Sequence, residues 1–424
     1  MIQRYSNKLK LDYSLSYILI ISLFLLWGIA SNLNGVLVNE LTNILSLGHW
    51  QKEFIQFVFY FGYFIMALPA AFLIRKYDYK AGIIIGLLFY GIGSFLFYPA
   101  TDLQTYSLFL IALLVIATGL SFLETAANPF VLSMGSKKNA IARLNLAQSF
   151  NPIGFLVSIG LSQKFIYSNS GVIHEQIDLL NSYQKQLSKI AEANNALMPY
   201  LIVGIIVIVW ALFIFLIKLP IAPEHQTDRL NPRNKMKWSN LLREKKLRYA
   251  IVAQFFYMGA QVGIWSYIPS YTNYLDIEVS LFSSYLFYSL MAFMAGRFIG
   301  SLIIYYISSR LVIGIYSCIS LLLTILAFVV GGEVALWCLI GTSFFMSIMF
   351  PTIFGIGLDG MINGRKFGSA LIVMGMIGGT LLTLLMGQIE SSQNMTISLM
   401  VPCVSFLVII WFAFNKHTKL QPTL

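Results

Sequence analysis

Twelve apolar runs, each of about 20 residues, follow one another along this 424-residue chain and restrict what it can fold into. A helix of that length crosses the roughly 30 Å hydrocarbon core of a bilayer. In lipid the backbone must satisfy its own hydrogen bonds, and the runs are too long and too uniformly apolar for barrel strands. We therefore predict an all-α membrane protein with twelve transmembrane helices. The runs lie at about residues 15–38, 54–74, 82–100, 105–132, 141–162, 199–218, 249–273, 281–305, 311–330, 335–358, 367–389 and 396–415.

The composition excludes an ordinary soluble domain. Hydrophobic residues make up 58% of the chain and charged residues only 11%, whereas a soluble protein has about 25% charged residues. The first apolar run is too long for a secretory signal peptide and lacks a small-residue cleavage site. We expect it to remain as a membrane anchor, with the lipid bilayer as a partner of the whole chain.

The distribution of Lys and Arg predicts the orientation. Of the 28 such residues, all but Lys52, Lys164, Lys185 and Lys189 fall in the connections on the side of the membrane that holds both termini. By the positive-inside rule both termini are cytoplasmic, and we predict a multi-pass protein of the cell (inner) membrane. The net charge of +11 is then a topological signal, so we expect no nucleic-acid partner.

Two polar stretches interrupt the apolar runs. Pro220–Lys246 separates the first six runs from the last six, so we predict an N-terminal six-helix bundle at 1–218, a cytoplasmic linker at 219–248 and a C-terminal six-helix bundle at 249–424. Two packed bundles with a site between them at the midplane are a common layout of secondary transporters. The other stretch, Gln163–Met198, is expected on the outside as a surface helix or a lid.

Glu124 is an acidic side chain deep inside an apolar run, in the segment Gly119-Leu-Ser-Phe-Leu-Glu124-Thr-Ala-Ala-Asn128-Pro129. A carboxylate at bilayer depth costs at least ~2.5 kcal/mol, so such residues normally face a cavity and mark a substrate or ion pathway. Burial disfavours the charged form of a carboxyl, so Glu124 can take up a proton on one side of the membrane and release it on the other. The sequence therefore predicts a transporter around Glu124.

Polar side chains in four runs indicate the substrate. Amides both donate and accept hydrogen bonds, which suits hydroxyl groups, and aromatic faces suit the C–H face of a pyranose ring. Any one intramembrane amide taken alone fits a structural role between helices better, but their concentration in four runs favours a site for a neutral sugar. They are Asn128, one turn after Glu124; Asn145, Gln148 and Asn151; Gln254, Tyr257, Gln261 and Trp265 on one helix face; and Trp27, Asn32 and Asn34.

Other kinds of chemistry find no support in the sequence. The cysteines, Cys318, Cys338 and Cys403, lie in apolar runs without metal-type spacing, so we expect no metal site and no cofactor. No Walker motif is present to bind ATP, and no nucleophile, base and orienting group converge, so we do not expect an enzyme. Arg297, toward the inner end of the eighth run, is expected to extend to the membrane surface or to contact a cytoplasmic gate. With no cation at the centre, an anionic substrate is disfavoured.

Longer motifs resemble a known family. In the first half these are Leu26-Trp27-Gly28, Leu123-Glu124-Thr125-Ala126-Ala127-Asn128-Pro129-Phe130 and Arg143-Leu144-Asn145-Leu146-Ala147-Gln148-Ser149-Phe150-Asn151; in the second, Ala253-Gln254-Phe255, Gly296-Arg297-Phe298 and Pro351-Thr352-Ile353-Phe354. They are similar to the fucose:proton symporter family of the major facilitator superfamily, and the resemblance runs from about Trp27 to Met386. It implies twelve helices in two halves, alternating access, and uptake of a neutral hexose-type sugar with a proton.

The resemblance also implies roles for single residues. Glu124 would be the proton-coupling residue, and Asn32, Gln148 and Asn151 would line the cavity. Two positions depart from the fucose carriers, which have an aspartate linked to proton coupling at Gly35 and a tyrosine at Phe350. Similar relatives that carry glucose, galactose, mannose or N-acetylglucosamine often have Leu-Asn-Gly at the first position, so the wider sugar range fits better than fucose itself.

These patterns predict an importer of a neutral monosaccharide by proton symport. A sugar uniporter of the same fold, an exporter of small neutral solutes and a sensor that binds without transporting remain open; the amide-rich set argues against a drug or peptide exporter. The predicted proton-coupling residue is Glu124, and the predicted substrate-binding residues are Trp27, Asn32, Asn128, Gln148, Asn151, Gln261 and Trp265.

Overall fold

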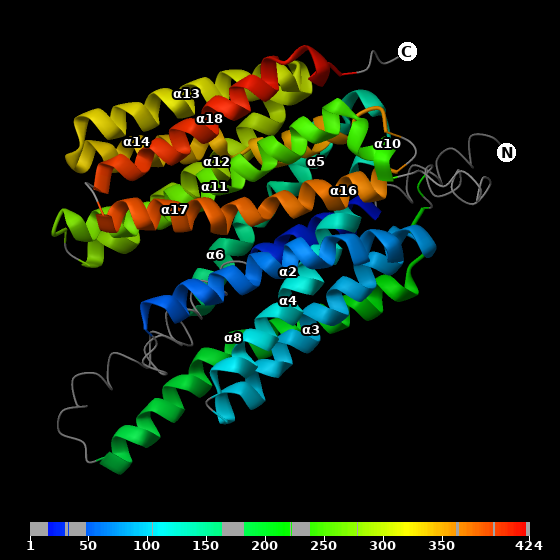
Figure 1. Cartoon of the computed structure of the whole chain (residues 1–424). Helices are drawn as coiled ribbons and strands as arrows, with labels where there is room; N and C mark the ends of the chain where they lie inside the picture. The colour runs from blue at the N-terminus through cyan, green and yellow to red at the C-terminus, as the bar shows by residue number, and fades with distance from the viewer. Residues whose placement is uncertain are drawn as a thin grey trace.

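The structure is a computed structural model, and every regular element in its described residues is a helix (Figure 1). The described residues are 16–29, 33, 48–103, 105–162, 182–220, 222, 238–277, 279–361, 364–392 and 395–420. The first helix covers Ser16–Ile29. The other α-helices are α2 (His49–Lys76), α3 (Tyr79–Asp102), α4 (Tyr106–Ser133), α5 (Ala140–Gln148), α6 (Asn151–Ser162), α8 (Ser182–Leu216), α10 (Trp238–Arg243), α11 (Lys245–Tyr274), α12 (Val279–Tyr306), α13 (Ser309–Val330), α14 (Gly332–Met346), α15 (Met349–Leu358), α16 (Arg365–Met374), α17 (Gly378–Ser392) and α18 (Met400–Phe414).

The predicted apolar runs fall on helices wherever the structure describes them. Nine helical segments in the described ranges are long and apolar enough to cross a membrane: Phe54–Lys76, Tyr79–Asp102, Tyr106–Ser133, Leu197–Leu216, Tyr285–Tyr306, Ser309–Val330, Gly332–Leu358, Arg365–Ser391 and Met395–Phe414. The other three runs correspond to the shorter apolar helix Ser16–Ile29, to the broken pair α5 and α6, and to α11, which carries the polar stripe. The chain is therefore an all-helical, multi-pass membrane protein.

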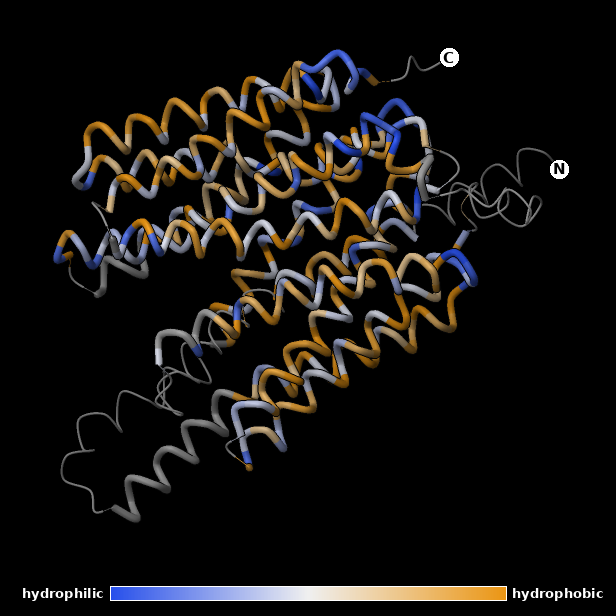
Figure 2. The backbone as a smooth tube through the Cα atoms, in the orientation of Figure 1, coloured by the Kyte–Doolittle hydropathy of each residue, from blue (hydrophilic) through white to orange (hydrophobic). Residues whose placement is uncertain are grey.

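The helices form two groups (Figure 1). The first helix, α2, α3, α4 and α8 lie in one group, the first bundle, and the helices from α11 to α18 lie in the other, the second bundle. The broken pair α5 and α6 runs between the groups, where α5 contacts α4 on one side and α12 and α15 on the other, and we count it with the first bundle by its place in the sequence. The two bundles lie close together at the end of the molecule near α10 and diverge toward the opposite end. Figure 2 shows hydrophobic residues along the helices and hydrophilic residues at their ends, most densely near α10. The predicted boundaries of the linker stay a prediction, because residues 223–237 lie outside the described ranges.

Helix α8 is longer than the sequence predicted. The sixth run was expected to begin at about residue 199, but the helix begins at Ser182 and ends at Leu216. At 1.5 Å per residue it is about 50 Å long, which exceeds the roughly 30 Å thickness of the hydrocarbon. The end of the polar stretch Gln163–Met198 is therefore a continuation of a membrane helix, and residues 163–181 lie outside the described part of the chain.

Basic side chains bond the carbonyls at the ends of three helices. Arg143 donates to three backbone carbonyls at and just after the end of α4. Lys80 donates to two at the end of α8, at 2.9 and 2.7 Å, and Arg310 to two at the end of α18, at 3.2 and 2.7 Å. The last carbonyls of a helix have no partner within it, and a cation there also interacts favourably with the helix dipole. These residues therefore stabilise helix ends as well as carrying charge.

Candidate functional site

Glu124 lies on α4, and its side chain is 3% exposed. One turn later, Asn128 is fully buried and donates from Nδ2 to Glu124 Oε2 at 3.4 Å. Tyr60 and Tyr63 of α2 and Arg297 of α12 lie close enough to interact electrostatically with the carboxyl. The prediction that Glu124 and Asn128 share a helix face within the bundle is correct, and the carboxyl is shielded from bulk water.

Gln148 extends this hydrogen-bonded line from α4 to α5. Its Nε2 donates to Asn128 Oδ1 at 2.9 Å, and the side chain is 4% exposed. Gln148 is the last residue of α5, and α6 begins at Asn151. The helix is interrupted here because Pro152 has no N–H to continue the hydrogen-bond pattern. Glu124, Asn128 and Gln148 thus form one connected set.

Asn151 lies where the first helix contacts α6. Its Nδ2 donates to the backbone carbonyl of Phe24 at 3.3 Å. A Cβ on Gly28 would lie 1.9 Å from the carbonyl oxygen of Asn151, and one on Gly154 would lie 2.2 Å from that of Leu25. The two helices therefore touch backbone to backbone, which small residues permit in membrane proteins.

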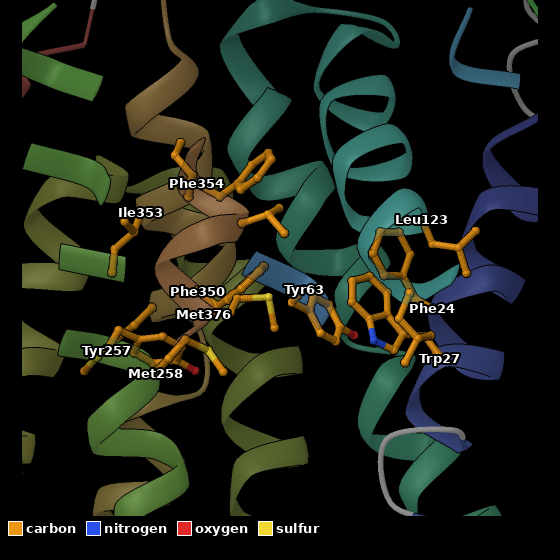
Figure 3. Packing of buried hydrophobic residues seen from close by; sticks show 14 of the residues in the cluster. Phe24, Trp27, Tyr63, Leu123, Tyr257, Met258, Phe350, Ile353, Phe354 and Met376 are labelled. Atoms are coloured by element: carbon orange, nitrogen blue, oxygen red, sulfur yellow. The ribbon is translucent and has the colours of Figure 1, made fainter. Parts of the chain in front are cut away.

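Trp27 is buried one residue before this glycine contact and stacks on Phe24 with ring centroids 5.9 Å apart. The Tyr63 hydroxyl lies beside the Trp27 side chain. Figure 3 shows Trp27 and Tyr63 of the first bundle across from Phe350 and Met376 of the second. Trp27 thus packs within the first bundle on the side of Tyr63, and its predicted contact with the sugar stays a prediction. Asn32, Asn34 and Gly35 lie outside the described residues.

The polar stripe of α11 divides into a buried inner part and a partly exposed outer part. Gln254 and Tyr257 are fully buried. Among the described residues, neither amide atom of Gln254 has a hydrogen-bond partner, nor does the Tyr257 hydroxyl. That hydroxyl lies beside Arg297 without reaching hydrogen-bond geometry. Gln254 and Tyr257 share the predicted helix face but lie at the end where the bundles meet.

Gln261 and Trp265 form the outer part of this stripe and are both partly exposed. Trp265 Nε1 donates to Ser343 Oγ at 3.4 Å. Its ring packs edge-on against Phe293, and against Phe155 of α6 with centroids 6.1 Å apart. Trp265 therefore contacts both bundles, and its predicted contact with the sugar stays a prediction.

Arg297 on α12 is buried at the contact between the two bundles. Its side chain is 5% exposed, so of the two roles expected for it extension to the membrane surface is wrong, while contact with a cytoplasmic gate stays a prediction. Nη1 donates to the carbonyl oxygen of Gln148 at 2.7 Å and Nε to that of Ser347 at 2.9 Å. The guanidinium also lies over the Phe293 ring at 4.7 Å. Because Gln148 belongs to the first bundle, Arg297 joins the two bundles, and it brings a cation within electrostatic reach of Glu124 where none was expected.

Two prolines explain why Arg297 bonds these carbonyls. In an α-helix the carbonyl of residue i accepts from the N–H of residue i+4. Pro152 and Pro351 stand four residues after Gln148 and Ser347, and proline has no N–H. Each carbonyl is left without a helical donor, and Arg297 supplies one to both. The two X-x-x-x-Pro spacings are a signal in the sequence that could have located this contact.

A third proline creates another bond between the bundles. Pro129 stands four residues after Thr125, and the carbonyl of Thr125 accepts from Ser369 Oγ of α16 at 3.1 Å. Asn145 Nδ2 of α5 also donates to Thr352 Oγ1 of α15 at 3.2 Å. We call these contacts, with those of Arg297, the interbundle seam.

The set of side chains suits a proton and an uncharged polar ligand. It combines the buried carboxyl of Glu124 with several amides and aromatic rings. Its cation, Arg297, is hydrogen-bonded to backbone carbonyls. Within the described ranges, no group of three or more His, Cys, Asp or Glu is placed to hold a metal ion.

Comparison with known proteins identifies the family. The family model of the Major Facilitator Superfamily matches residues 19–383. The chain is a member of the major facilitator superfamily. The chain is 38% identical to the L-fucose-proton symporter of Escherichia coli (strain K12), and the match covers 96% of this chain and 94% of the relative. It is 29% identical to the glucose/galactose transporter of Brucella abortus biovar 1 (strain 9-941), over 92% and 91% of the two chains.

A solved structure confirms the fold of this chain. The crystal structure of FucP, a major facilitator superfamily transporter in the outward conformation, superposes with a TM-score of 0.84 at 36% identity. The match covers 95% of this chain and 98% of FucP. The predicted fucose:proton symporter family and twelve-helix fold are confirmed, and the relatives are transporters, not enzymes.

Proposed function

We propose that this transporter imports a neutral monosaccharide together with a proton by alternating access. The observation that supports it most directly is the buried line from Glu124 through Asn128 to Gln148. A carboxyl in such a line can change its proton occupancy and affect the amides around it. The relatives, named L-fucose-proton symporter and glucose/galactose transporter, support a sugar and a proton as the two substrates.

In this proposal Glu124 carries the proton. Sugar hydroxyls bind best in one protonation state of the carboxyl, and this differential affinity couples the two fluxes. Asn128 hydrogen-bonds both Glu124 and Gln148, so a change in the protonation of Glu124 reaches Gln148 through it. Asn128 is also a proposed sugar contact. The remaining proposed sugar contacts are Trp27, Asn32, Gln148, Asn151, Gln261 and Trp265.

We also propose an orientation in the cell membrane. Helix α10 lies within the predicted cytoplasmic linker, so the end of the molecule near α10 is assigned to the cytoplasmic side. The interbundle seam and both termini are assigned to the same side. The bundles diverge toward the other end (Figure 1), so this conformation is assigned to the outward-facing state. The outward conformation of FucP, to which the chain is similar, supports this assignment.

The sugar is proposed to be fucose or another hexose-type sugar, and two positions that differ from the resemblance to the fucose carriers favour the wider range. Phe350 replaces the tyrosine of the fucose carriers, and its ring lies 6.3 Å from those of both Tyr257 and Phe354, centroid to centroid. It offers a ring face for stacking and no hydroxyl for hydrogen bonding. Gly35 likewise removes a carboxylate that the fucose carriers have.

The test is uptake of a panel of labelled sugars into membrane vesicles that contain the protein. We expect accumulation of at least one neutral hexose above its external concentration, and collapse of that accumulation when a protonophore is added. Uptake that equilibrates but never exceeds the external concentration would support the uniporter. Strong competition by a sugar phosphate would contradict a neutral substrate.

A further inference from the structure

We propose that the surface between the start of α11 and the end of α18 binds an anionic phospholipid from the membrane leaflet at the α10 end of the molecule. This surface is separate from the candidate transport site, and the inference holds whichever solute is carried. It combines a cluster of exposed basic side chains with an apolar stripe. The basic cluster consists of Lys245 and Arg248 of α11 and of Lys416 and Lys419, which follow α18.

The two helix ends that carry the basic cluster pack against each other. Trp411 of α18 lies edge-on against Tyr249 of α11, with ring centroids 4.7 Å apart. The short helix η6 (Lys416–Thr418) follows α18, and the ring of its His417 lies 6.1 Å from that of Tyr249. Figure 2 shows hydrophilic residues where α11 begins and where α18 ends. Basic groups that are far apart in the sequence are therefore brought together on one surface.

The positive charge of the basic cluster is not balanced within the described part of the chain. All four side chains are exposed, and none of them forms an ion pair with a described residue. Glu244, the N-cap of α11, is a single exposed carboxyl against these four cations. Desolvation, and then the charges of Lys245 and Lys416, lower the pKa of His417, which agrees with an excess of positive charge here.

The helix ends do not balance this charge either. Lys245 stands in the first turn of α11, where the helix dipole is itself positive. At the end of α18, the carbonyls of Ala413 and Asn415 already accept hydrogen bonds from Arg310. Helix capping therefore does not account for the basic cluster, and an anion placed among its members would be attracted by all of them.

An apolar stripe on α18 leads away from the basic cluster and favours a lipid over a soluble anion. Its members recur every three or four residues, so they share one helix face, and each is between 46% and 57% exposed. They are Met400, Val404, Leu407, Trp411 and Phe414. At 1.5 Å per residue the stripe is about 21 Å long, which exceeds the roughly 15 Å of hydrocarbon in one leaflet.

Both helices change from basic to apolar at the same end. On α11 the exposed Val252 follows Arg248 by one turn. On α18 the exposed Trp411 stands just before the basic residues, and Trp is enriched where the hydrocarbon meets the headgroups. A phosphate at the basic cluster would therefore have its acyl chains beside the stripe. The positive-inside rule explains the side on which Lys and Arg lie, but not their gathering at the end of this stripe; basic pockets between membrane helices bind anionic headgroups.

The test measures lipid binding to the purified full-length protein by native mass spectrometry in an uncharged detergent. The probes are phosphatidylglycerol, phosphatidylcholine with the same acyl chains, and glycerol phosphate, which carries the anionic group without the chains. Each Lys or Arg near the lipid surface contributes about fivefold to binding of an anionic lipid, which corresponds to about 1 kcal/mol. We expect the first phosphatidylglycerol to bind at least ~25-fold more tightly than phosphatidylcholine, as two such residues would give. An excess of glycerol phosphate should not displace it.

The double variant Lys245→Gln/Lys416→Gln removes half of the basic cluster. It should weaken phosphatidylglycerol binding by about 25-fold and leave phosphatidylcholine binding unchanged. The matched control is Lys137→Gln/Lys138→Gln, which removes two exposed charges from η1 (Lys137–Asn139) on the same predicted side of the membrane. This control should bind phosphatidylglycerol as the unmodified protein does.

Equal weakening by the two double variants would overturn the proposal, because any basic residue on that side would then serve. Equal affinity for the two lipids would also overturn it, and so would displacement by glycerol phosphate, which would show a site for a soluble anion. If the cluster variant does not fold, Arg248→Gln decides: about fivefold weaker binding supports the proposal and unchanged binding overturns it. No transport is measured, so a failure of the proposed sugar symport would leave this result unaffected.

Discussion

Replacing Glu124 with Gln tests the proton role most sharply, because the structure predicts that the fold and the sugar contacts survive. A glutamine has the shape of the protonated acid, and its Oε1 can still accept from Asn128. A hydrogen bond to a charged group contributes about 1.5–3 kcal/mol and one to a neutral group about 1 kcal/mol, so the loss of stability is small. Only the ability to exchange a proton is removed.

The expected change in transport is much larger. One charge that crosses a potential of 100 mV releases about 2.3 kcal/mol. Because about 1.4 kcal/mol corresponds to a tenfold ratio, one coupled proton supports an internal sugar concentration about 50 times the external one. Glu124→Gln should reduce this ratio to about 1, while the exchange of labelled for unlabelled sugar across the membrane continues, since the variant resembles the permanently loaded carrier.

The assay uses proteoliposomes with an imposed membrane potential, and measures both net accumulation and counterflow of the labelled hexose. Glu333→Gln is a suitable control, because Glu333 is an exposed carboxyl that accepts a hydrogen bond from Tyr285 at 2.6 Å away from the proposed site. It should accumulate sugar as the unmodified protein does. Normal accumulation by Glu124→Gln, or loss of counterflow together with accumulation, would refute the assignment of the coupling proton to Glu124.

Three further predictions follow from the site. Trp265→Ala and Gln261→Ala should each weaken sugar binding by ~1–3 kcal/mol, through lost stacking and an unpaired hydroxyl; unchanged competition constants for unlabelled hexose would show that the outer stripe does not contact the sugar. Gly154→Ala should destabilise the protein by about 1–3 kcal/mol and lower transport, because the new Cβ would overlap the backbone of the first helix. The control is Gly160→Ala on the same helix, whose Cβ meets open space, so it should leave the thermal unfolding temperature unchanged. Gly35→Asp should convert the single ionisation in the pH profile of uptake into two steps, because two interacting acids titrate as a pair; a two-step profile already present in the unmodified protein would mean that a second acid shares the proton.

Much of the fold could be predicted from the sequence because lipid leaves the backbone few choices. Long apolar runs must be helices, and the spacing of Glu124 and Asn128 at i and i+4 places them on one face whatever surrounds them. The length of α8 could not be predicted in this way, because its first residues, from Ser182 to Met198, are helical although they belong to a polar stretch. Hydropathy measures where the hydrocarbon ends, not where the helix ends.

The candidate site was predictable only as far as local spacing reaches. Gln254 and Trp265 project from the same face of α11, yet one is fully buried and the other partly exposed, because the bundles meet at one end and diverge at the other. One of the two roles expected for Arg297, extension to the membrane surface, was wrong for a similar reason. Its position near the end of an apolar run suggested the membrane surface, whereas its partners are carbonyls that Pro152 and Pro351 free on segments distant in the sequence.

The basic residues that bond helix ends have a consequence for how the protein is assembled. Lys80 and Arg310 belong to the bias of Lys and Arg from which we predict the orientation of the chain in the membrane. Once the helices pack, Lys80 bonds carbonyls 135 and 137 residues later in the chain, and Arg310 bonds carbonyls 103 and 105 residues later. On the predicted orientation, the same ammonium and guanidinium groups act twice, first in setting the direction of insertion and then as tertiary contacts. A helix pair inserted in the wrong orientation would leave these basic groups without their carbonyls and the last carbonyls of the helices without donors.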